Sequence, residues 1–416
     1  MKNQEKSGND KQQKPLILVF SSLFPSANQP NAGLFIRERM FHVGEVLPIV
    51  VVSPVPWFPF QGLIRLLKPH YRPTAAKLEN QNGVQVYHPK FFSVPFLFRQ
   101  FDGLMMALSC YGLLKRLQKE MNYSVIDSHF AFPDGYAATW IAKRLRVPCT
   151  ITIRGTEVPH SKTNKKRWLI TALSRADRIF SVADFLKRHV VSLGVDAEKI
   201  VVVGNGVDEK KFYPLEKQDM KKKLDIVNSS PVIVSVGGLV ERKGFHLVIQ
   251  ILPELIKNFP NLVYLVVGGA SAEGNWESHL KKMVADLNLE KHVKFLGPRP
   301  PEELKEILSA ADLFVLATRN EGWANVFLEA MACGLPVVTT KVGGNAEVVT
   351  HSDLGLLVPY KDELALLAAL NSALNKTWDR EKIIEYAKQN SWDSRVAVLA
   401  KEFLQLCQNQ NKAQGS

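Results

Sequence analysis

The sequence predicts an α/β protein with two Rossmann-like, doubly wound domains that face each other across a cleft. Its 416 residues suit two hydrophobic cores better than one. Short apolar, β-branched segments alternate with longer amphipathic ones, and this alternation recurs in both halves of the chain. Because parallel strands covered on both faces are nearly all apolar, the pattern favours two open parallel sheets built from βαβ units.

The expected strands and helices follow this alternation. In the first half, strands are expected at 16–21, 49–53, 84–87, 125–128, 149–153, 178–182 and 200–203. In the second half, they are expected at 232–235, 263–267, 293–296, 313–316, 336–339 and 356–358. Helices are expected between them, including 135–144, 246–258, 276–287 and 301–310. Ligands of such sheets bind at the carboxyl ends of the strands.

Changes in composition along the chain predict the domain boundaries. Residues 1–15 are hydrophilic and are expected to be a disordered tail. An N-terminal Rossmann-like domain is expected at 16–210 and a C-terminal Rossmann-like domain at 230–385, separated by the charge-rich segment 209–230. Residues 386–410 are expected to form a helix that returns towards the N-terminal domain.

The net charge of +13 is concentrated in the first half. Residues 1–211 hold 30 Lys and Arg against 16 Asp and Glu, whereas the remainder holds 23 against 24. An anionic membrane surface, an acidic acceptor or nucleic acid would each explain a basic half. The sequence has no recognisable nucleic-acid-binding motif, so no nucleic acid partner is expected.

The same sequence gives expectations about location. The N-terminus lacks the apolar segment of a signal peptide, and the weakly polar run 104–114 is too short to span a bilayer. Four widely separated cysteines form no CxxC pair, which argues against a disulfide framework or a zinc site. A cytoplasmic protein is therefore expected.

The segment EGWANVFLEAMACGLPVV at 321–338 carries the clearest chemical signal. Gly322 permits a turn after an expected strand, and a helix is expected to begin at 323–325. The amides at the start of this helix would suit a pyrophosphate, and they belong to Gly322, Trp323, Ala324 and Asn325. Glu329 lies about two turns after Glu321, and carboxylates accept hydrogen bonds from sugar hydroxyls. A solvated helix start with two incidental glutamates is the alternative.

With its E-x7-E spacing, this segment resembles the retaining GT-B glycosyltransferases of family 4, also called glycosyl transferases group 1. Further matches to the family are GNGVD at 204–208, VGGLVERKGF at 236–245, FLG at 295–297 and VGGNAEVV at 342–349. The similarity is strongest from 233 to 359 and weaker in the N-terminal half. The resemblance implies a GT-B fold.

The resemblance also implies roles for individual residues. Glu321 would contact the transferred sugar, Glu329 would bind the ribose hydroxyls, and Lys243 would neutralise the diphosphate leaving group. The other residues implied at the donor site are Gly237, Gly238, Arg242, Gly297, Gly322, Trp323, Ala324, Asn325 and Val326. The family often has arginine at the position of Gly238, so either Arg242 substitutes for it or the phosphate contact is weaker. An exposed loop lysine is the alternative for Lys243.

Four residues outside the donor motifs are further candidates. His129 matches a family histidine that contacts the donor sugar, which would make it catalytic together with Glu321 and Lys243; a structural histidine is the alternative. Arg154 lies where relatives often have histidine, and burying an unpaired arginine at a strand end would be costly. Gly33 lies in a loop like one that the family uses near the reacting centre. Asn205 is equally suited to a turn or to ligand binding.

The predicted activity is retaining transfer of a hexose-type sugar from a nucleotide diphosphate sugar, with UDP favoured and GDP possible. The expected acceptor is a glycan or lipid-linked molecule in cell-surface polysaccharide or glycolipid synthesis. No D-x-D motif is present, so neither a metal nor a cofactor is expected. A non-catalytic nucleotide-sugar binding protein or a nucleotide-sugar epimerase on the same fold is the alternative.

Three segments suggest peripheral binding to an anionic membrane, on the inner face of the cell membrane. Residues 55–73, 91–120 and 162–175 combine cations with aromatic and aliphatic side chains, as interfacial helices do. Trp168, beside Lys165, Lys166 and Arg167, is expected to insert at the interface. Core helices with solvated basic faces are the alternative.

Overall fold

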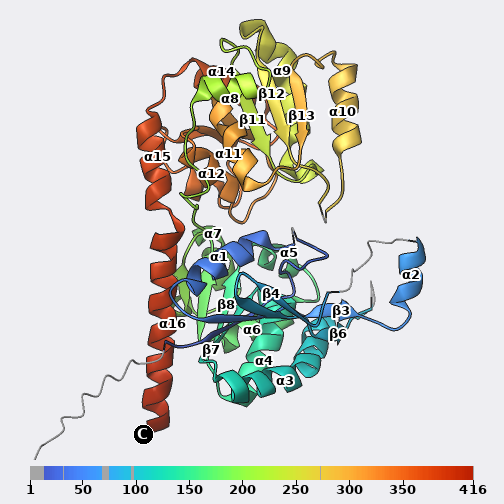
Figure 1. The fold of residues 1–416 in the computed structure, drawn as a ribbon, viewed down its shortest axis with the longest axis vertical. Coiled ribbons are helices and arrows are strands. Elements are labelled where there is room, and N and C mark those ends of the chain that lie inside the picture. Colours follow the sequence, from blue (N-terminus) through green and yellow to red (C-terminus); the bar gives the residue numbers. More distant parts are fainter. Residues whose placement is uncertain (1–13, 31, 68–74, 95–97, 272, 416) are drawn as a thin grey trace, which may run out of the picture. The chain divides into compact units, whose positions relative to one another are not determined.

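The computed structural model describes residues 14–30, 32–67, 75–94, 98–271 and 273–415, and its chain divides into two compact units (Figure 1). The first unit comprises Met1–Phe180, Leu193–Val201 and Val396–Ser416, and the second comprises Ser181–Ser192 and Val202–Arg395. Apart from Lys14 and Pro15, the predicted disordered tail lies outside the described residues.

The first unit is built around an eight-stranded sheet with the strand order β10-β9-β8-β7-β1-β2-β5-β4. Its strands are β1 (Ile17–Phe20), β2 (Ile49–Val52), β4 (Leu78–Gln81), β5 (Val84–Tyr87), β7 (Val125–His129), β8 (Cys149–Ile153), β9 (Arg178–Ser181) and β10 (Ile200–Val202). β1 pairs in parallel with β2 and with β7, so the direction of strand succession reverses beside β1. Ligand sites in open α/β sheets form at such reversals.

Three strands of the first unit have no counterpart among the expected strands. β4 pairs antiparallel with β5 at the sheet edge, and its sequence LENQ is polar because this strand is largely exposed. β3 (Val55–Trp57) and β6 (Lys90–Phe92) form a separate parallel pair of only three residues each. Such short or half-exposed strands lack the apolar run that marks a buried parallel strand.

The helices of the first unit have the bounds α1 (Leu34–Gly44), α2 (Gln61–Leu67), α3 (Asp102–Met121), α4 (Tyr136–Leu145), α5 (Glu157–His160) and α6 (Lys166–Arg175). One core layer packs Leu18 and Phe20 of β1 against Met106 and Leu114 of α3. The expected helix 135–144 begins one residue later, after a turn at Ala131–Gly135 that contains the cis Phe132–Pro133 bond.

The second unit contains a six-stranded, wholly parallel sheet with the order β13-β12-β11-β14-β15-β16. Its strands are β11 (Val232–Val236), β12 (Val263–Val267), β13 (Val293–Gly297), β14 (Leu313–Leu316), β15 (Val337–Thr340) and β16 (Gly355–Val358). Strand succession reverses between β11 and β14, as in a dinucleotide-binding sheet. The predicted α/β class with parallel Rossmann-like sheets is therefore confirmed.

Apolar layers lie on both faces of the second sheet. Val232 and Val234 of β11 join one layer, whereas Ile233 joins the other, as the alternation of side chains along a strand requires. The helices of this unit are α7 (Asp184–Ser192), α8 (Lys217–Lys223), α9 (Phe245–Asn258), α10 (Glu277–Asp286), α11 (Pro301–Ala310), α12 (Asn325–Ala332), α13 (Asn345–Val348), α14 (Glu363–Asn375) and α15 (Arg380–Gln389).

The last helix, α16 (Trp392–Gly415), contributes residues to both units. In the second unit, the Trp392 amide donates to the carbonyl of Val207 at 3.1 Å. In the first unit, the ring of Phe403 packs edge-on against Phe180, with centroids 5.6 Å apart. Arg178 Nε also lies 2.8 Å from Glu402 Oε2. In the part of the chain that the structure describes, no helix is long and apolar enough to cross a membrane.

Candidate active site

The carboxylate of Glu321 lies where two neighbouring central strands of the second unit end. Glu321 follows β14 and is only 8% exposed. Its Oε1 accepts hydrogen bonds from Lys243 Nζ at 2.7 Å, Arg242 Nη1 at 3.2 Å and Thr318 Oγ1 at 3.0 Å. Arg242 and Lys243 belong to the short 3-10 helix Glu241–Lys243 that follows β11. The fold thus brings three of the predicted donor-site residues together.

The backbone of Glu321 is fixed by the loop that follows β15. The Gly344 amide donates to the Glu321 carbonyl at 3.1 Å. Gly343 has φ 51°, and a Cβ at this position would lie 1.9 Å from the same carbonyl oxygen. Only glycine tolerates both this backbone conformation and this close approach. The VGGN sequence therefore holds the strand-to-helix turn that presents the Glu321 side chain.

The helix after this turn, α12, begins at Asn325, within the expected range 323–325. Ala324 precedes it and provides no side-chain cap, so the positive end of the helix dipole is not neutralised by a capping side chain. Glu329 is half-buried in the second turn of α12, and Val326 packs partly buried against the core. Gly322 is half-buried in the turn.

The GNG turn at 204–206 packs against the start of α12. A Cβ on Gly204 would lie 2.6 Å from Cη2 of Trp323, so glycine allows the indole ring to approach the turn. Asn205 is buried, and its Nδ2 donates to Oδ1 of Asn325 at 2.8 Å. Asn205 thus links this turn to the start of α12 through its side chain, a role that its local sequence does not indicate.

The glycines after β11, β12 and β13 are linked by backbone hydrogen bonds. The Gly237 amide donates to the carbonyl of Val267 at 3.0 Å, and the Gly268 amide donates to that of Gly297 at 3.0 Å. Gly237 also packs over Lys243, since a Cβ there would lie 3.5 Å from Cε of the lysine. The predicted glycines therefore border one edge of the sheet at its carboxyl ends.

In the first unit, His129 lies at the end of β7 with no exposed surface. Its Nδ1 faces the guanidinium of Arg154, with Nε at 3.3 Å and Nη2 at 3.2 Å. Its Nε2 lies 3.4 Å from Asp127 Oδ2. Burial lowers the pKa of His129 to about 4, and Asp127 opposes this shift. The ring is therefore neutral at pH 7, with Nδ1 as acceptor and the proton on Nε2 facing Asp127.

Arg154, at the end of β8, is the half-exposed member of this cluster. Its guanidinium lies 5.1 Å from the centre of the Phe35 ring, a cation–π contact. The buried carboxylate of Glu157 accepts hydrogen bonds from the amides of Arg154 at 3.1 Å and Gly155 at 2.8 Å. In this structure, Arg154 rather than His129 has surface that a ligand can contact.

Gly33 precedes α1 with φ 70°, and a Cβ there would lie 2.4 Å from the carbonyl oxygen of Leu23. It therefore holds the loop after β1 against the start of α1.

Deeper in the same unit, the buried Asp134 accepts hydrogen bonds from the Ser22 amide at 3.2 Å and from Ser22 Oγ at 3.1 Å. Asp134 was not predicted, because nothing in its local sequence indicates a partner 112 residues away.

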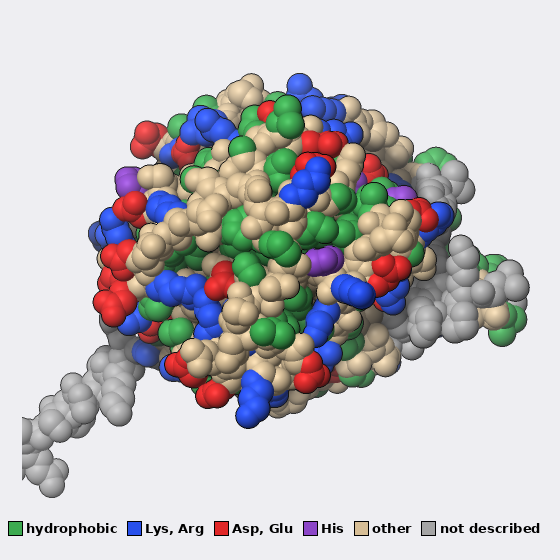
Figure 2. Space-filling view, turned by 90° about the horizontal axis from the view of Figure 1, so that it is seen from above, with side chains coloured by type: hydrophobic (Ala, Val, Ile, Leu, Met, Phe, Trp, Pro, Cys, Tyr) green, Lys and Arg blue, Asp and Glu red, His purple; other side chains and the backbone are tan. Residues whose placement is uncertain are grey.

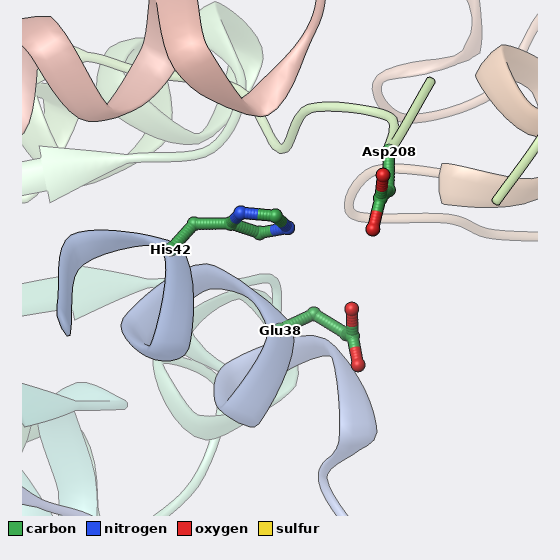
Figure 3. Close-up of side chains that lie close together, drawn as sticks. All are labelled: Glu38, His42 and Asp208. Atoms are coloured by element: carbon green, nitrogen blue, oxygen red, sulfur yellow. The ribbon is translucent and has the colours of Figure 1, made fainter. Parts of the chain in front are cut away.

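Potential metal ligands are sparse in both candidate sites. Among the described residues of the second unit, no three His, Cys, Asp or Glu side chains lie close enough together to hold a metal ion. In the first unit, Glu38 and His42 lie one turn apart on α1 (Figure 3), too few ligands to define a site. His42 Nδ1 lies 3.3 Å from Glu45 Oε1.

Two family profiles match the chain. Residues 216–390 match the family described as "Glycosyl transferases group 1", and residues 48–211 match "Glycosyltransferase Family 4". The putative teichuronic acid biosynthesis glycosyltransferase TuaC of Bacillus subtilis is 27% identical over 92% of this chain and 91% of its own length. The D-inositol 3-phosphate glycosyltransferase of Corynebacterium urealyticum is 36% identical over 70% of this chain and 73% of its own length.

Solved structures share the fold. The Anabaena protein HepE in complex with UDP-glucose superposes with a TM-score of 0.64 at 20% identity, over 97% of this chain and 99% of that chain. The fold is the GT-B architecture, and the family matches define the chain as a glycosyltransferase. The chain belongs to the group 1, family 4 glycosyltransferases, which confirms the family predicted from the sequence.

Proposed function

We propose that the chain transfers a hexose-type sugar from a nucleotide diphosphate sugar, with UDP as the favoured nucleotide, to a glycan or lipid-linked acceptor. The observation that carries this proposal is the Lys243–Glu321 pair, at 2.7 Å, where β11 and β14 end. It places an ammonium, which suits a diphosphate, beside a carboxylate, which suits sugar hydroxyls. The HepE complex with UDP-glucose supports UDP as the nucleotide.

The proposed chemistry divides the work between these groups. The bond from the anomeric carbon to the diphosphate oxygen breaks, and the acceptor oxygen bonds to that carbon on the same face. This same-face attack retains the configuration of the anomeric carbon, and the acceptor proton passes to the departing diphosphate. Lys243 and the uncapped start of α12 would stabilise the charge that develops on the leaving group. Glu329 would hold the ribose, and no metal or cofactor is needed for these steps.

The names of the relatives support cell-surface polysaccharide or glycolipid synthesis as the setting. TuaC is named for teichuronic acid biosynthesis, and the Corynebacterium relative for D-inositol 3-phosphate. The decisive experiment is a thermal-shift screen of UDP, GDP, ADP and their sugars, followed by turnover of each sugar that binds. Binding to the folded state raises the melting temperature. If no nucleotide binds, the proposal is wrong; binding without transfer to any acceptor would favour a binding protein.

We further propose that the enzyme is cytoplasmic and binds peripherally to the inner face of the cell membrane through its first unit. The basic excess of residues 1–211 supports electrostatic attraction to anionic lipid. Phe60, Leu66 and Phe98 of the first unit are 80%, 79% and 69% exposed, which supports apolar contacts with a membrane. On the face drawn in Figure 2, by contrast, basic and acidic side chains are interspersed.

Trp168 does not fit the role expected for it at the membrane. Its ring packs edge-on against Tyr136 at 4.9 Å and against Phe101 at 5.9 Å, so it helps to hold α6 in place. The test is co-sedimentation with phosphatidylglycerol vesicles and with neutral vesicles, at low and high salt. Leu66→Ser should weaken binding to the anionic vesicles, whereas Leu364→Ser, equally exposed in the second unit, should not. Equal binding to both vesicle types would contradict the proposal.

A further inference from the structure

The guanidinium of Arg242 already uses most of its N–H groups in hydrogen bonds within the protein. Its Nε and Nη2 donate to the two carboxylate oxygens of Glu273, at 2.8 and 2.6 Å. Its Nη1 donates to the carbonyl of Asn320 at 2.7 Å and to Glu321 Oε1 at 3.2 Å. A guanidinium has five N–H groups, and these four bonds occupy four of them.

Lys243 differs from its neighbour in this respect. Its ammonium has three N–H groups. Among the described residues, its one hydrogen bond goes to Glu321 Oε1, at 2.7 Å. Two N–H groups of Lys243 can therefore bind an incoming ligand without breaking a bond, whereas Arg242 would have to give up a carboxylate or a carbonyl.

The backbone of Arg242 also contributes to the placement of Glu321. The Arg242 carbonyl accepts a hydrogen bond from the Arg319 amide at 2.8 Å and lies 3.1 Å from Thr318 Oγ1. Thr318 Oγ1 in turn lies 3.0 Å from Glu321 Oε1. Arg242 therefore connects the loop of Glu273 with residues 318–321, and both its main chain and its side chain contribute.

The packing at Gly238 leaves little room for a side chain at that position. A Cβ on Gly238 would lie 3.0 Å from Cβ of Ser271 and 3.3 Å from its Oγ, so the loop carrying Glu273 occupies the space that a side chain would need. This loop instead provides the carboxylate that binds Arg242. Hydrogen bonding to Glu273 raises the pKa of Arg242, and the same bond lowers the pKa of Glu273, so both groups remain charged at neutral pH.

We propose that Arg242 is a positioning residue for Glu321 and that Glu273 fixes Arg242 in this role. Lys243 then remains as the side-chain cation of this loop that meets the donor diphosphate. This inference rests on the proposed function and replaces the expectation that Arg242 substitutes for the arginine missing at Gly238. It also assigns a role to Glu273, which lies outside every motif identified in the sequence.

The test compares binding with turnover in the full-length protein. UDP, UMP, GDP and GMP serve as binding probes, and UDP-glucose and GDP-mannose as donors, with nucleotide release as the readout. We expect Arg242→Ala, Arg242→Lys and Glu273→Gln to lower kcat roughly tenfold or more, and to change the Kd of the diphosphate less than about threefold. Lys243→Ala should instead raise the diphosphate Kd roughly tenfold or more, with little effect on the monophosphate Kd.

Arg242→Lys is the discriminating variant, because lysine keeps the charge but cannot bind a carboxylate through a planar fork. If Arg242 were the phosphate cation, this variant would retain turnover, and Arg242→Ala would weaken diphosphate binding as Lys243→Ala does; either result overturns the inference alone. If the wild-type protein binds none of the nucleotides, the proposed function fails and the inference with it. Asp286→Asn is the control, since it breaks the exposed Lys282–Asp286 pair on α10 and should leave both readouts unchanged.

Discussion

The two units carry charged clusters at equivalent places, the carboxyl ends of neighbouring central strands, but the clusters differ in access. In the second unit, Glu321 lies in a loop and Lys243 ends a short 3-10 helix, and both keep some exposed surface. In the first unit, Asp127 and His129 lie within β7 itself and are sealed, and only Arg154 beside them is half-exposed. Charges at the surface of a site can bind a ligand, whereas sealed charges mainly fix one another.

His129 and Glu321 are held in place by different kinds of neighbour. The hydrogen bonds of His129 fix its tautomer, and burial keeps it neutral, so its surroundings organise the ring before any ligand arrives. Glu321 is organised by cations that a diphosphate would also attract. Ligand binding should therefore perturb the second cluster directly and the first cluster much less.

The largest expected effect is that of Lys243→Ala on the second cluster. Loss of one preorganised cation at the leaving group should lower kcat/KM by roughly a hundredfold or more, measured with the donor that the wild-type enzyme consumes. Lys282→Ala, in an exposed helix pair, is the matched control and should change little. A Lys243 variant with wild-type kinetics would remove the functional distinction between the two clusters.

The two glutamates should then separate binding from turnover. Glu329→Ala should mainly weaken nucleotide binding and Glu321→Ala should mainly lower kcat, each by roughly ten- to a hundredfold. Calorimetric binding of UDP, together with steady-state kinetics on the active donor, provides both measurements. Wild-type behaviour of both variants would show that the donor site lies elsewhere.

A smaller effect concerns the interior of the first unit. Burial raises the pKa of Asp134 from 3.8 to about 7, and its hydrogen bonds from Ser22 oppose this shift. The protonated carboxyl is therefore favoured by folding, so its contribution to stability is complete below about pH 4 and is lost as the pH rises through about 7. His129 titrates in the opposite sense, since its depressed pKa makes stability fall as the pH drops from about 6.5 to 4.

Comparison with Asp134→Asn isolates the aspartate, because His129 is present in both proteins. Between pH 4 and 8, the unfolding free energy of the wild type relative to this variant should fall by on the order of a few kcal/mol. Urea denaturation at intervals across this range is the measurement. A difference that does not depend on pH would mean that Asp134 is charged in the folded protein, and that the first unit is less sealed than its exposure indicates.

No effect at all is expected from metal removal. Turnover should be unchanged in excess EDTA, since Lys243 and the start of α12 are proposed to stabilise the leaving group without a cation. Loss of activity in EDTA with rescue by magnesium or manganese would contradict this expectation. It would also show that the cluster around Glu321 and Lys243 needs a metal ion for turnover.

The fold was predictable because most of its strands are short runs rich in apolar and β-branched residues. β5, β8, β12 and β14 have the expected bounds, whereas the polar edge strand β4 and the three-residue strands β3 and β6 carry no such signal. The expected helices begin within one residue of the observed ones, and α12 begins at Asn325, the last position of its expected range, after the turn that Gly343 and Gly344 hold.

The residues proposed for the donor site could be predicted from the sequence because they lie in short motifs beside β11 and β14. Glu273 could not, since its partner Arg242 is 31 residues away and their contact depends on how the loop after β12 folds back. The cluster around His129 likewise joins α1, β7, β8 and α5, and no local pattern specifies such an arrangement. The packing of Trp168 against Tyr136 could not be predicted from the sequence either, because an aromatic residue beside cations is as compatible with a protein core as with a membrane surface.

The path of α16 has a consequence for synthesis of the protein. Domains usually fold in order as the ribosome releases them. Here the core of the first unit includes Phe403, which is translated only after the whole of the second unit. More than two hundred residues are therefore synthesised after Phe180 before its partner ring, Phe403, leaves the ribosome. The first unit should remain open to chaperones and proteases throughout that interval, so pulse proteolysis of ribosome-bound chains should find it sensitive until α16 has been made.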